Sequence, residues 1–206
     1  MRDWLFIDKY YQELLQDIYE QPEDVGHTVM AKEIIEKWFP KMDGRTVVDM
    51  GCGTGFCSDF VEEQGKEYIG IEEGTVSKSP IILNKDFSFT GFKDNTFDIV
   101  LSRHSLEHSP FPLLTLMDWH RISKKYLLLV LPNPDYYTYM GRNHYSVMNK
   151  QQTRWILRRA GWEVMETDYS EHTELRFLCE KRDRKSFEGY LEKLTNKVYE
   201  ADRDGN

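Results

Sequence analysis

The chain has 206 residues, of which 40% are hydrophobic and 30% charged, and its formal net charge is −8. This composition predicts a soluble globular domain and excludes a disordered chain. The acidic balance disfavours broad binding to a phosphate backbone, and no apolar run reaches the roughly 18 residues of a membrane-spanning helix. We therefore expect neither a nucleic-acid partner nor a membrane association.

Cysteine usage indicates the compartment. The three cysteines, Cys52, Cys57 and Cys179, match neither a disulfide framework nor a C-x₂-C metal spacing. Residues 1–4 lack the apolar region of a secretory signal peptide. The sequence therefore predicts a reduced, cytoplasmic protein.

Two helices are predicted ahead of the first strand. The first has apolar side chains at helical spacing, namely Tyr11, Leu14, Leu15 and Ile18. The second repeats this spacing up to Pro40, with Met30, Ile34 and Trp38 on one face. We interpret residues 1–43 as N-terminal cap helices. Trp4, Tyr10 and Tyr11 are candidates for the mouth of the substrate site, although the sequence favours a packing role for each of them.

A strand, a glycine loop and a helix start are predicted over residues 46–62. Val47 and Val48 precede Asp49, and glycines then occupy positions 51, 53 and 55. Glycines let the backbone turn tightly and approach a ligand closely. Phe56 stands where a dinucleotide-binding loop has glycine, and no lysine follows closely enough for a P-loop. An acid before the glycines suits a ligand with a cationic group.

Acidic residues end the next two predicted strands. The apolar run 68–71 leads into Glu72 and Glu73, about 20 positions after the first glycine, which is the spacing of a ribose-binding acid. A carboxylate can accept two hydrogen bonds from a vicinal diol. The short run 81–84 precedes Asp86 and Phe87.

The remaining elements complete an alternation of strands and helices, which predicts a parallel sheet covered on both faces. A fourth strand runs to Ser102, and a fifth spans 123–132. Residues 132–148 form a long aromatic loop after this strand, so we interpret them as a substrate lid. A helix over 150–160 is closed by Gly161. An antiparallel strand pair, 162–166 and 173–179, and a helical tail, 184–206, complete the chain.

The order of these motifs resembles a known family. The pattern V-D-x-G-C-G-T-G at 47–55 is similar to motif I of the class I S-adenosylmethionine-dependent methyltransferases, and residues 91–102 are similar to the family's segment before and within strand four. Residues 103–108 resemble the L-E-H signature of the small-molecule subgroup, of methyltransferase type 11/12. The resemblance implies an α/β fold: a Rossmann-like three-layer sandwich with a mostly parallel seven-stranded sheet and an antiparallel last strand.

The resemblance also implies the cofactor and its site. The chain is then one methyltransferase domain over 1–206 with its cofactor-binding core at 44–181, and S-adenosylmethionine leaves as S-adenosylhomocysteine. Glu72 would bind the ribose diol and Asp86 the adenine amino group. The implied cofactor-binding residues are Asp49, Gly51, Cys52, Gly53, Phe56, Glu72, Glu73, Asp86, Phe87, Ser102 and Arg103.

Catalytic candidates follow strand four and lie in the lid. His104 is the first choice as the group that takes a proton from the acceptor, because histidine transfers protons near neutrality, and a packing role beside the cofactor is an equal alternative. Glu107 and His144 are the further candidates. Tyr136, Tyr139, Arg142 and Tyr145 are the candidate substrate contacts in the lid.

The element His104-x-x-Glu107-His108 is similar to one with which some ubiquinone-pathway and small-RNA 2′-O-methyltransferases hold a divalent metal. His104 stands in place of the first acid, which disfavours a hard Mg²⁺ ion, so the sequence assigns no metal.

Taken together, the motifs predict in-line methyl transfer from S-adenosylmethionine to a small molecule, by a monomer or a homodimer. One alternative is a nucleic-acid or protein acceptor. The residues after strand four, Ser102-Arg103-His104-Ser105, lack the N/D-P-P-aromatic motif of many enzymes that act on flipped bases. Another alternative is a protein or partner subunit that binds the cofactor without turnover.

Overall fold

The computed structural model describes residues 9–11, 13–14, 28–73, 81–136, 143–170 and 172–182. Several sequence predictions lie outside these residues. They are most of the first cap helix, including Leu15 and Ile18, the candidate substrate residues Tyr139 and Arg142, and the tail 184–206.

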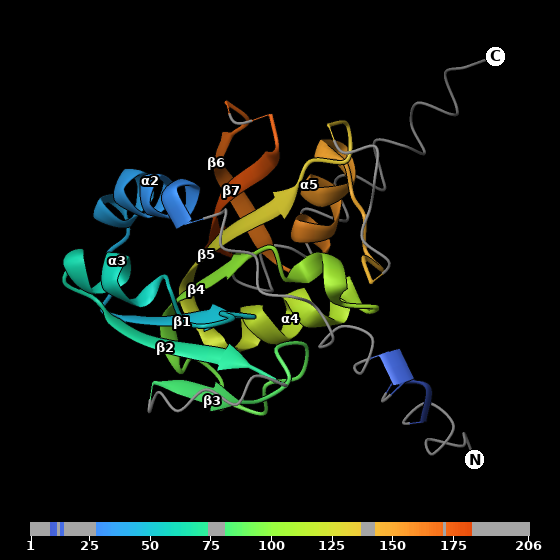
Figure 1. The fold of residues 1–206 in the computed structure, drawn as a ribbon, viewed down its shortest axis with the longest axis horizontal. Helices are drawn as coiled ribbons and strands as arrows, with labels where there is room; N and C mark the ends of the chain where they lie inside the picture. Colours follow the sequence, from blue (N-terminus) through green and yellow to red (C-terminus); the bar gives the residue numbers. More distant parts are fainter. Residues whose placement is uncertain are drawn as a thin grey trace.

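A seven-stranded sheet forms the centre of the fold, with strand order β3-β2-β1-β4-β5-β7-β6. Only β7 runs antiparallel to its neighbours, so the predicted fold class is confirmed (Figure 1). The strands are β1 (Thr46–Met50), β2 (Glu67–Glu72), β3 (Ile82–Asn84), β4 (Phe97–Arg103), β5 (Ser123–Pro132), β6 (Trp162–Asp168) and β7 (Glu174–Lys181).

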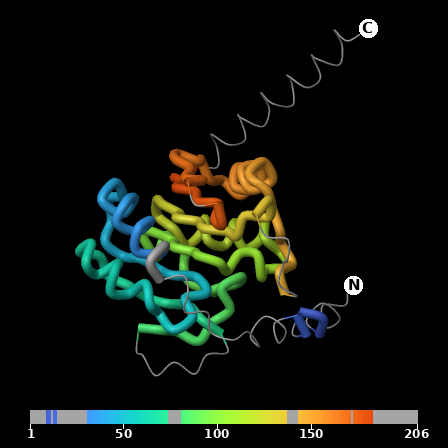
Figure 2. Tube along the Cα trace, turned by 45° about the horizontal axis from the view of Figure 1, so that its top comes forward, coloured from blue at the N-terminus to red at the C-terminus, as the bar shows by residue number. Residues whose placement is uncertain are grey.

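Helices cover both faces of this sheet, as its apolar strands require. The helices are α2 (Thr28–Trp38), α3 (Ser58–Glu63), α4 (Pro112–Ile122) and α5 (Lys150–Arg159), with short 3₁₀ turns η2 (Phe39–Lys41) and η3 (Leu106–His108). Along β5, Leu127 and Leu129 pack in the core layer of α4 and α5, whereas Leu128 and Val130 pack in that of α2 and α3. The strand period of two thus separates two hydrophobic layers. Figure 2 traces the backbone of the sheet and of the helices that cover it.

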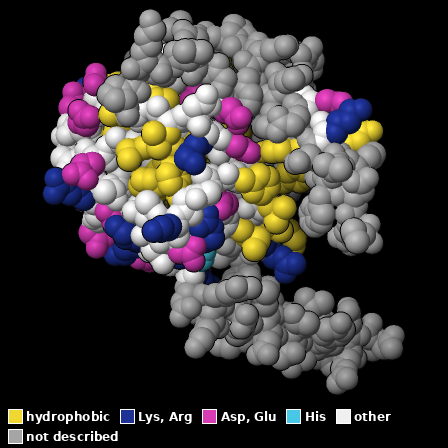
Figure 3. All heavy atoms as spheres, turned by 90° about the horizontal axis from the view of Figure 1, so that it is seen from below, with side chains coloured by type: hydrophobic (Ala, Val, Ile, Leu, Met, Phe, Trp, Pro, Cys, Tyr) yellow, Lys and Arg dark blue, Asp and Glu magenta, His cyan; other side chains and the backbone are white. Residues whose placement is uncertain are grey.

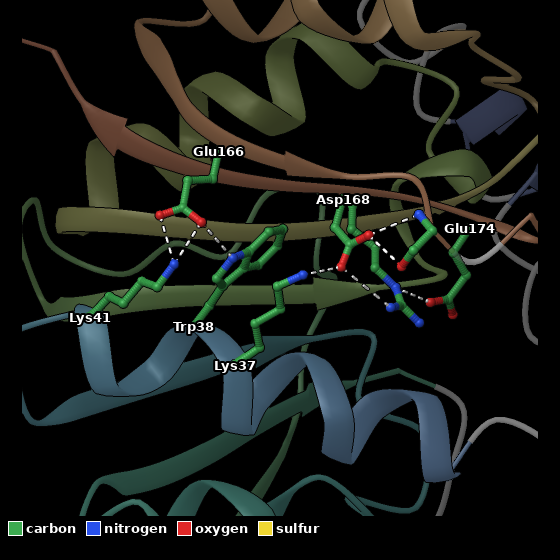
Figure 4. Close-up of polar contacts among 8 residues, drawn as sticks. Lys37, Trp38, Lys41, Glu166, Asp168 and Glu174 are labelled. Carbon is green, nitrogen blue, oxygen red and sulfur yellow. Dashed lines mark hydrogen bonds and ion pairs between the residues drawn. The ribbon is translucent and has the colours of Figure 1, made fainter.

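Helix α2 is fastened to the far edge of the sheet by polar contacts from one face (Figure 4). The indole of Trp38 is fully buried and donates to Glu166 on β6 at 3.1 Å. Lys41 donates to both oxygens of the same carboxylate, and Lys37 donates to Asp168. Exposed ion pairs of this kind contribute little, so burial of the tryptophan supplies most of the stabilisation.

The ends of α5 follow the sequence prediction closely. Asn149 caps the helix by accepting from the backbone N–H groups of Gln151 and Gln152, each at 3.0 Å, and the Gln152 side chain accepts in return from the Asn149 N–H. Gly161, with φ of +96°, follows the last turn, a conformation that side-chain-bearing residues rarely adopt.

The described surface mixes charged and hydrophobic side chains, as the face seen in Figure 3 illustrates. None of the helices in the described part of the chain combines the length and the apolar character needed to span a bilayer. Cys52, Cys57 and Cys179 are all buried free thiols.

Replacing the α5 cap tests the packing of this helix. We expect Asn149→Ala to lower the free energy of unfolding by about 1 kcal/mol, because two backbone N–H groups lose their acceptor. Urea denaturation, monitored by circular dichroism, measures the free energy of unfolding. Gln151→Ala, at an exposed position in the same turn, is the matched control and is expected to change the value by less than about 0.5 kcal/mol.

Candidate active site

The carboxyl ends of β1, β2 and β4 meet at one edge of the sheet, where open α/β sheets bind their ligands (Figure 1). The glycine loop follows β1 at this edge. The N–H groups of Gly51 and Cys52 both donate to the carbonyl of Ile71 in β2, at 2.8 and 3.1 Å. The loop is therefore held against the neighbouring strand before any ligand binds.

Gly51 is required at its position for two reasons. Its φ is +68°, and a Cβ there would lie 2.5 Å from the hydroxyl oxygen of Ser105. That hydroxyl donates to the carbonyl of Met50 at 2.6 Å. The start of the segment after β4 is thus packed directly against the glycine loop.

Glu72 at the end of β2 reaches back to the loop. Its Oε2 accepts from the N–H of Gly53 at 2.7 Å. Burial raises the pKa of this carboxyl above its usual range, and the nearby Glu73 raises it further. Glu72 and the glycine loop therefore form one unit. Ribose binding by Glu72 stays a prediction.

Asp49 lies beneath the loop and is almost fully buried. Burial raises its pKa to about 7, and the negative charge of Glu72 adds to this effect, although the hydroxyl of Tyr68 donates to Asp49 Oδ2 at 2.8 Å. Two neighbouring carboxyl groups with raised pKa values favour a ligand that brings positive charge.

Asp86, the expected adenine acceptor, is bound by the N-terminal segment. It accepts from the hydroxyl of Tyr11 and from the N–H of Ser88, the latter at 2.7 Å. The Tyr11 ring packs against Phe89 and Phe111, with centroids 5.8 and 5.7 Å away. Tyr11 thus covers the end of β3, and its hydroxyl occupies one acceptor position of the predicted adenine site.

The other predicted cofactor residues differ in their surroundings. Phe87 is a core residue, and its carbonyl accepts from the Trp119 indole at 2.7 Å. Cys52 is buried, whereas Phe56 and Glu73 are half-buried near the loop. Ser102 is fully buried in β4. The side chain of Arg103 is directed to Glu174, to which it donates at 2.6 Å.

His104 adopts a left-handed backbone conformation, with φ of +52°, which is uncommon for a residue other than glycine. Its Nε2 lies 2.9 Å from Oε1 of Glu174. Glu174 is fully buried and also accepts from Arg176 at 2.7 Å. Burial opposes ionisation of Glu174, but the His104 hydrogen bond and the charge of Arg103 outweigh it and lower the pKa to about 2.

Glu107, His108 and His144 form a second cluster beside His104. One ligand atom from each of the three lies within 4.8 Å of the others. Burial raises the pKa of Glu107 to about 8 and lowers that of His108 to about 4. Burial also lowers the pKa of His144. At neutral pH both histidines are neutral, with ring nitrogens able to accept a proton or bind an ion.

The two described ends of the segment predicted to be a lid, residues 132–148, differ in how firmly they are attached to the fold. Tyr136, at its start, is exposed. Its other end is fastened to η3, because the N–H of Ser146 donates to the carbonyl of Glu107 at 2.9 Å and its hydroxyl donates to the carbonyl of Ser109. Tyr145 lies in this fastened part and is half-buried. The structure thus brings His144 to the cluster, keeps Tyr145 half-buried as the next residue in the chain, and leaves Tyr136 at the surface.

Sequence reasoning missed Glu174 and Arg176 as site residues. A signal was available, because both are charged residues within a predicted strand that is otherwise apolar, and a charged residue inside such a strand is rarely buried without a partner. The sequence also placed His104 in the possible metal-binding element. In the structure His104 binds Glu174, and His144 joins Glu107 and His108 instead.

Comparison with known proteins agrees with this geometry. A family model described as a methyltransferase domain matches residues 23–167. A search of the curated proteins finds no match. The chain belongs to the methyltransferase-domain family, and its predicted membership of the class I S-adenosylmethionine-dependent methyltransferases is confirmed, as is S-adenosylmethionine as the cofactor.

Solved structures share the fold at low identity. A methyltransferase from Archaeoglobus fulgidus, S-adenosylmethionine-dependent, is 17% identical with a TM-score of 0.60, over 83% of this chain and all of the other (100%). The 1,6-didemethyltoxoflavin-N1-methyltransferase of Burkholderia thailandensis is 16% identical with a TM-score of 0.62, over 86% of each chain. Magnesium protoporphyrin IX methyltransferase from Synechocystis is 16% identical with a TM-score of 0.59, over 87% of this chain and 100% of the other.

The raised pKa of Asp49 leads to a pH-dependent stability. The folded chain holds this proton up to about pH 7, whereas an unfolded aspartate releases it near its ordinary pKa of 3.8, so the wild type loses stability as pH rises across this window. Asp49→Asn removes this loss. We expect the stability of the variant relative to the wild type to rise between pH 5 and pH 8, by up to about 3 kcal/mol.

Thermal unfolding of the ligand-free proteins at several pH values measures this effect. Asp59→Asn, at an exposed position in α3, is the control, and its difference from the wild type should change little with pH. A difference between Asp49→Asn and the wild type that stays constant from pH 5 to pH 8 would contradict the prediction.

Proposed function

We propose that this chain transfers the methyl group of S-adenosylmethionine to a small-molecule acceptor. The observation that carries the proposal is the contact between Ser105 and Met50. Ser105 directly follows His104, and Met50 directly precedes the glycine loop. The contact therefore holds the polar cluster that begins at His104 next to the glycine loop. An acceptor bound at this cluster would therefore lie beside the cofactor's methionine end.

The acidic pocket fits the charge of the cofactor. S-adenosylmethionine carries a sulfonium and an ammonium group, and Asp49 and Glu72 supply buried carboxyl groups beneath and beside the loop. In this proposal Glu72 binds the ribose diol, and Asp86 accepts from the adenine amino group while Tyr11 covers it. Cofactor binding then offsets the charge repulsion between Asp49 and Glu72.

The reaction is an in-line displacement. The bond between sulfur and the methyl carbon breaks, its electron pair stays on sulfur, and the acceptor atom forms the new bond to carbon. The leaving thioether is neutral and needs no acid. The protein's contribution is alignment of the two reactants and exclusion of water. A hydroxyl or protonated amine acceptor must also lose a proton.

His104 is placed to take that proton. Because Glu174 is ionised and lies at Nε2, His104 carries its own proton on Nε2, and Nδ1 is the basic nitrogen of the ring. The same carboxylate would stabilise the imidazolium that forms. The Nδ1 atom lies 3.6 Å from Oε1 of Glu107, on the side of the cluster with His144. In this proposal Glu107 and His144 orient the acceptor.

Support for a small acceptor comes from the size and burial of this cluster. Glu107 and His108 are buried, and His144 is half-buried. The net charge of −8 is unsuited to a polyanionic partner. Two similar structures belong to enzymes named for small-molecule acceptors, 1,6-didemethyltoxoflavin and magnesium protoporphyrin IX. Tyr145 and the lid would provide acceptor contacts.

Binding of the product tests the role of Glu72. We expect Glu72→Gln to weaken S-adenosylhomocysteine binding about ten- to hundredfold, because hydrogen bonds to an ionised carboxylate are worth about 1.5–3 kcal/mol. Isothermal titration calorimetry measures it. Glu67→Gln, at the exposed start of the same strand, is the control and should bind like the wild type. Equal affinity in Glu72→Gln would assign ribose binding to another residue.

Turnover tests the role of His104. A screen of metabolite extracts with methyl-labelled S-adenosylmethionine identifies the acceptor. We then expect His104→Asn to lower kcat about a hundredfold or more with little change in S-adenosylhomocysteine affinity. Glu174→Gln should lower kcat in the same direction, because it no longer fixes the ring. Binding of the cofactor without transfer to any extract component would favour a binding protein instead.

A further inference from the structure

The cluster of Glu107, His108 and His144 combines residues from two segments that are distant in the sequence. Glu107 and His108 lie in η3, and His144 lies in the loop before α5. One side-chain oxygen or nitrogen from each lies within 4.8 Å of the other two. One ion placed between the three residues would therefore contact all of them after small rotamer adjustments.

The carboxylate of Glu107 is the most informative member. It is 1% exposed, and neither of its oxygens has a hydrogen-bond partner among the described residues. Buried carboxyl groups almost always have partners, because an unpaired one costs several kcal/mol. His104 Nδ1 is 3.6 Å from Oε1, which is too long for a hydrogen bond. A cation is the partner that such a group lacks.

The two histidines have the arrangement of metal ligands. His144 has a buried Nδ1 with no hydrogen-bond partner in the described part of the chain. Nδ1 of His108 lies 3.2 Å from the carbonyl of Asn143, a contact that fixes the orientation of the ring beside Glu107 and His144. A hydrogen bond from the second ring nitrogen to a carbonyl is a recurrent support of ligating histidines. The rings lie edge to face, 4.8 Å apart.

The two segments are also held together independently of any ion. The Ser146 N–H donates to the Glu107 carbonyl at 2.9 Å, two residues after His144. The Ser146 hydroxyl donates to the carbonyl of Ser109, just after His108. The backbone on both sides of the cluster is thus fixed, and the site is preorganised.

We propose that Glu107, His108 and His144 bind one divalent first-row transition ion. Two imidazoles and one carboxylate suit ions such as Zn²⁺, Co²⁺ or Fe²⁺ better than Mg²⁺ or Ca²⁺, which prefer all-oxygen sites. Three protein ligands leave coordination positions for an acceptor. His104 is not a ligand in this proposal, because Glu174 binds its Nε2.

The proposal deepens the function proposed above and rests on it for its role, although ion binding can be measured without turnover. A bound ion would hold an oxygen or nitrogen of the acceptor and make its proton easier to remove. His104 Nδ1, 3.6 Å from Oε1 of Glu107, is placed to receive that proton.

Cobalt titration of tag-free, chelator-treated full-length protein tests the site. We expect one equivalent of Co²⁺ to bind with visible d–d absorption, and Zn²⁺ but not millimolar Mg²⁺ to displace it. Glu107→Gln and His144→Asn should each weaken Co²⁺ binding at least about tenfold. His172→Asn, at an exposed position, is the matched control and should bind Co²⁺ like the wild type.

Each result decides the proposal. No Co²⁺ binding by the wild type, or equal binding by Glu107→Gln and His144→Asn, overturns it. If the two variants do not fold, nuclear magnetic resonance of the wild-type protein with Co²⁺ is the deciding measurement. Ligation of His108 by Co²⁺ gives a hyperfine-shifted signal from the exchangeable ring N–H of this histidine. Absence of that signal overturns the site. S-adenosylhomocysteine binding, measured in parallel, separates this outcome from failure of the methyltransferase proposal.

Discussion

The hydrogen bond from the Ser105 hydroxyl to the Met50 carbonyl, 2.6 Å long, connects the two halves of the candidate active site. It joins the end of β1, where the glycine loop begins, to the segment that follows β4. A glycine at position 51 is needed because the Ser105 side chain occupies the space of its missing Cβ. Neighbouring parallel strands make this contact possible, since their carboxyl ends meet at one edge. Cofactor loop and acceptor cluster are therefore one packed unit.

Buried acids dominate the electrostatics of this unit, and their environments differ. Glu174 is ionised because two arginines and His104 surround it. Asp49, Glu72 and Glu107 have raised pKa values because burial outweighs their few partners. These three buried acids lower the stability of the ligand-free fold, and binding of a cation beside them restores that stability. The sulfonium cofactor proposed for the first two acids and the metal ion proposed for the third follow the same physical rule.

Much of the fold could be predicted from the sequence because its signals are local. The apolar run 123–132 coincides with β5, and the helix predicted over 150–160 is observed as Lys150–Arg159 with Gly161 beyond it. Glu72 was selected as a candidate from its spacing to the glycine loop, and its side chain accepts a hydrogen bond from the Gly53 N–H of that loop. Glu174 was missed because its partner His104 lies 70 positions away. A contact at that distance leaves no periodic pattern in either segment.

The sequence by itself determined the class of protein, the cofactor loop and the acids at the strand ends, because backbone conformation and strand periodicity act over a few residues. Tertiary structure decided which distant side chains meet. Tyr11 reaches Asp86 across 75 positions, and His144, rather than His104, completes the cluster of Glu107 and His108. The reason is the parallel sheet, whose crossover connections bring separate chain segments to the same edge, so that the chemistry of the acceptor side is assembled only by folding.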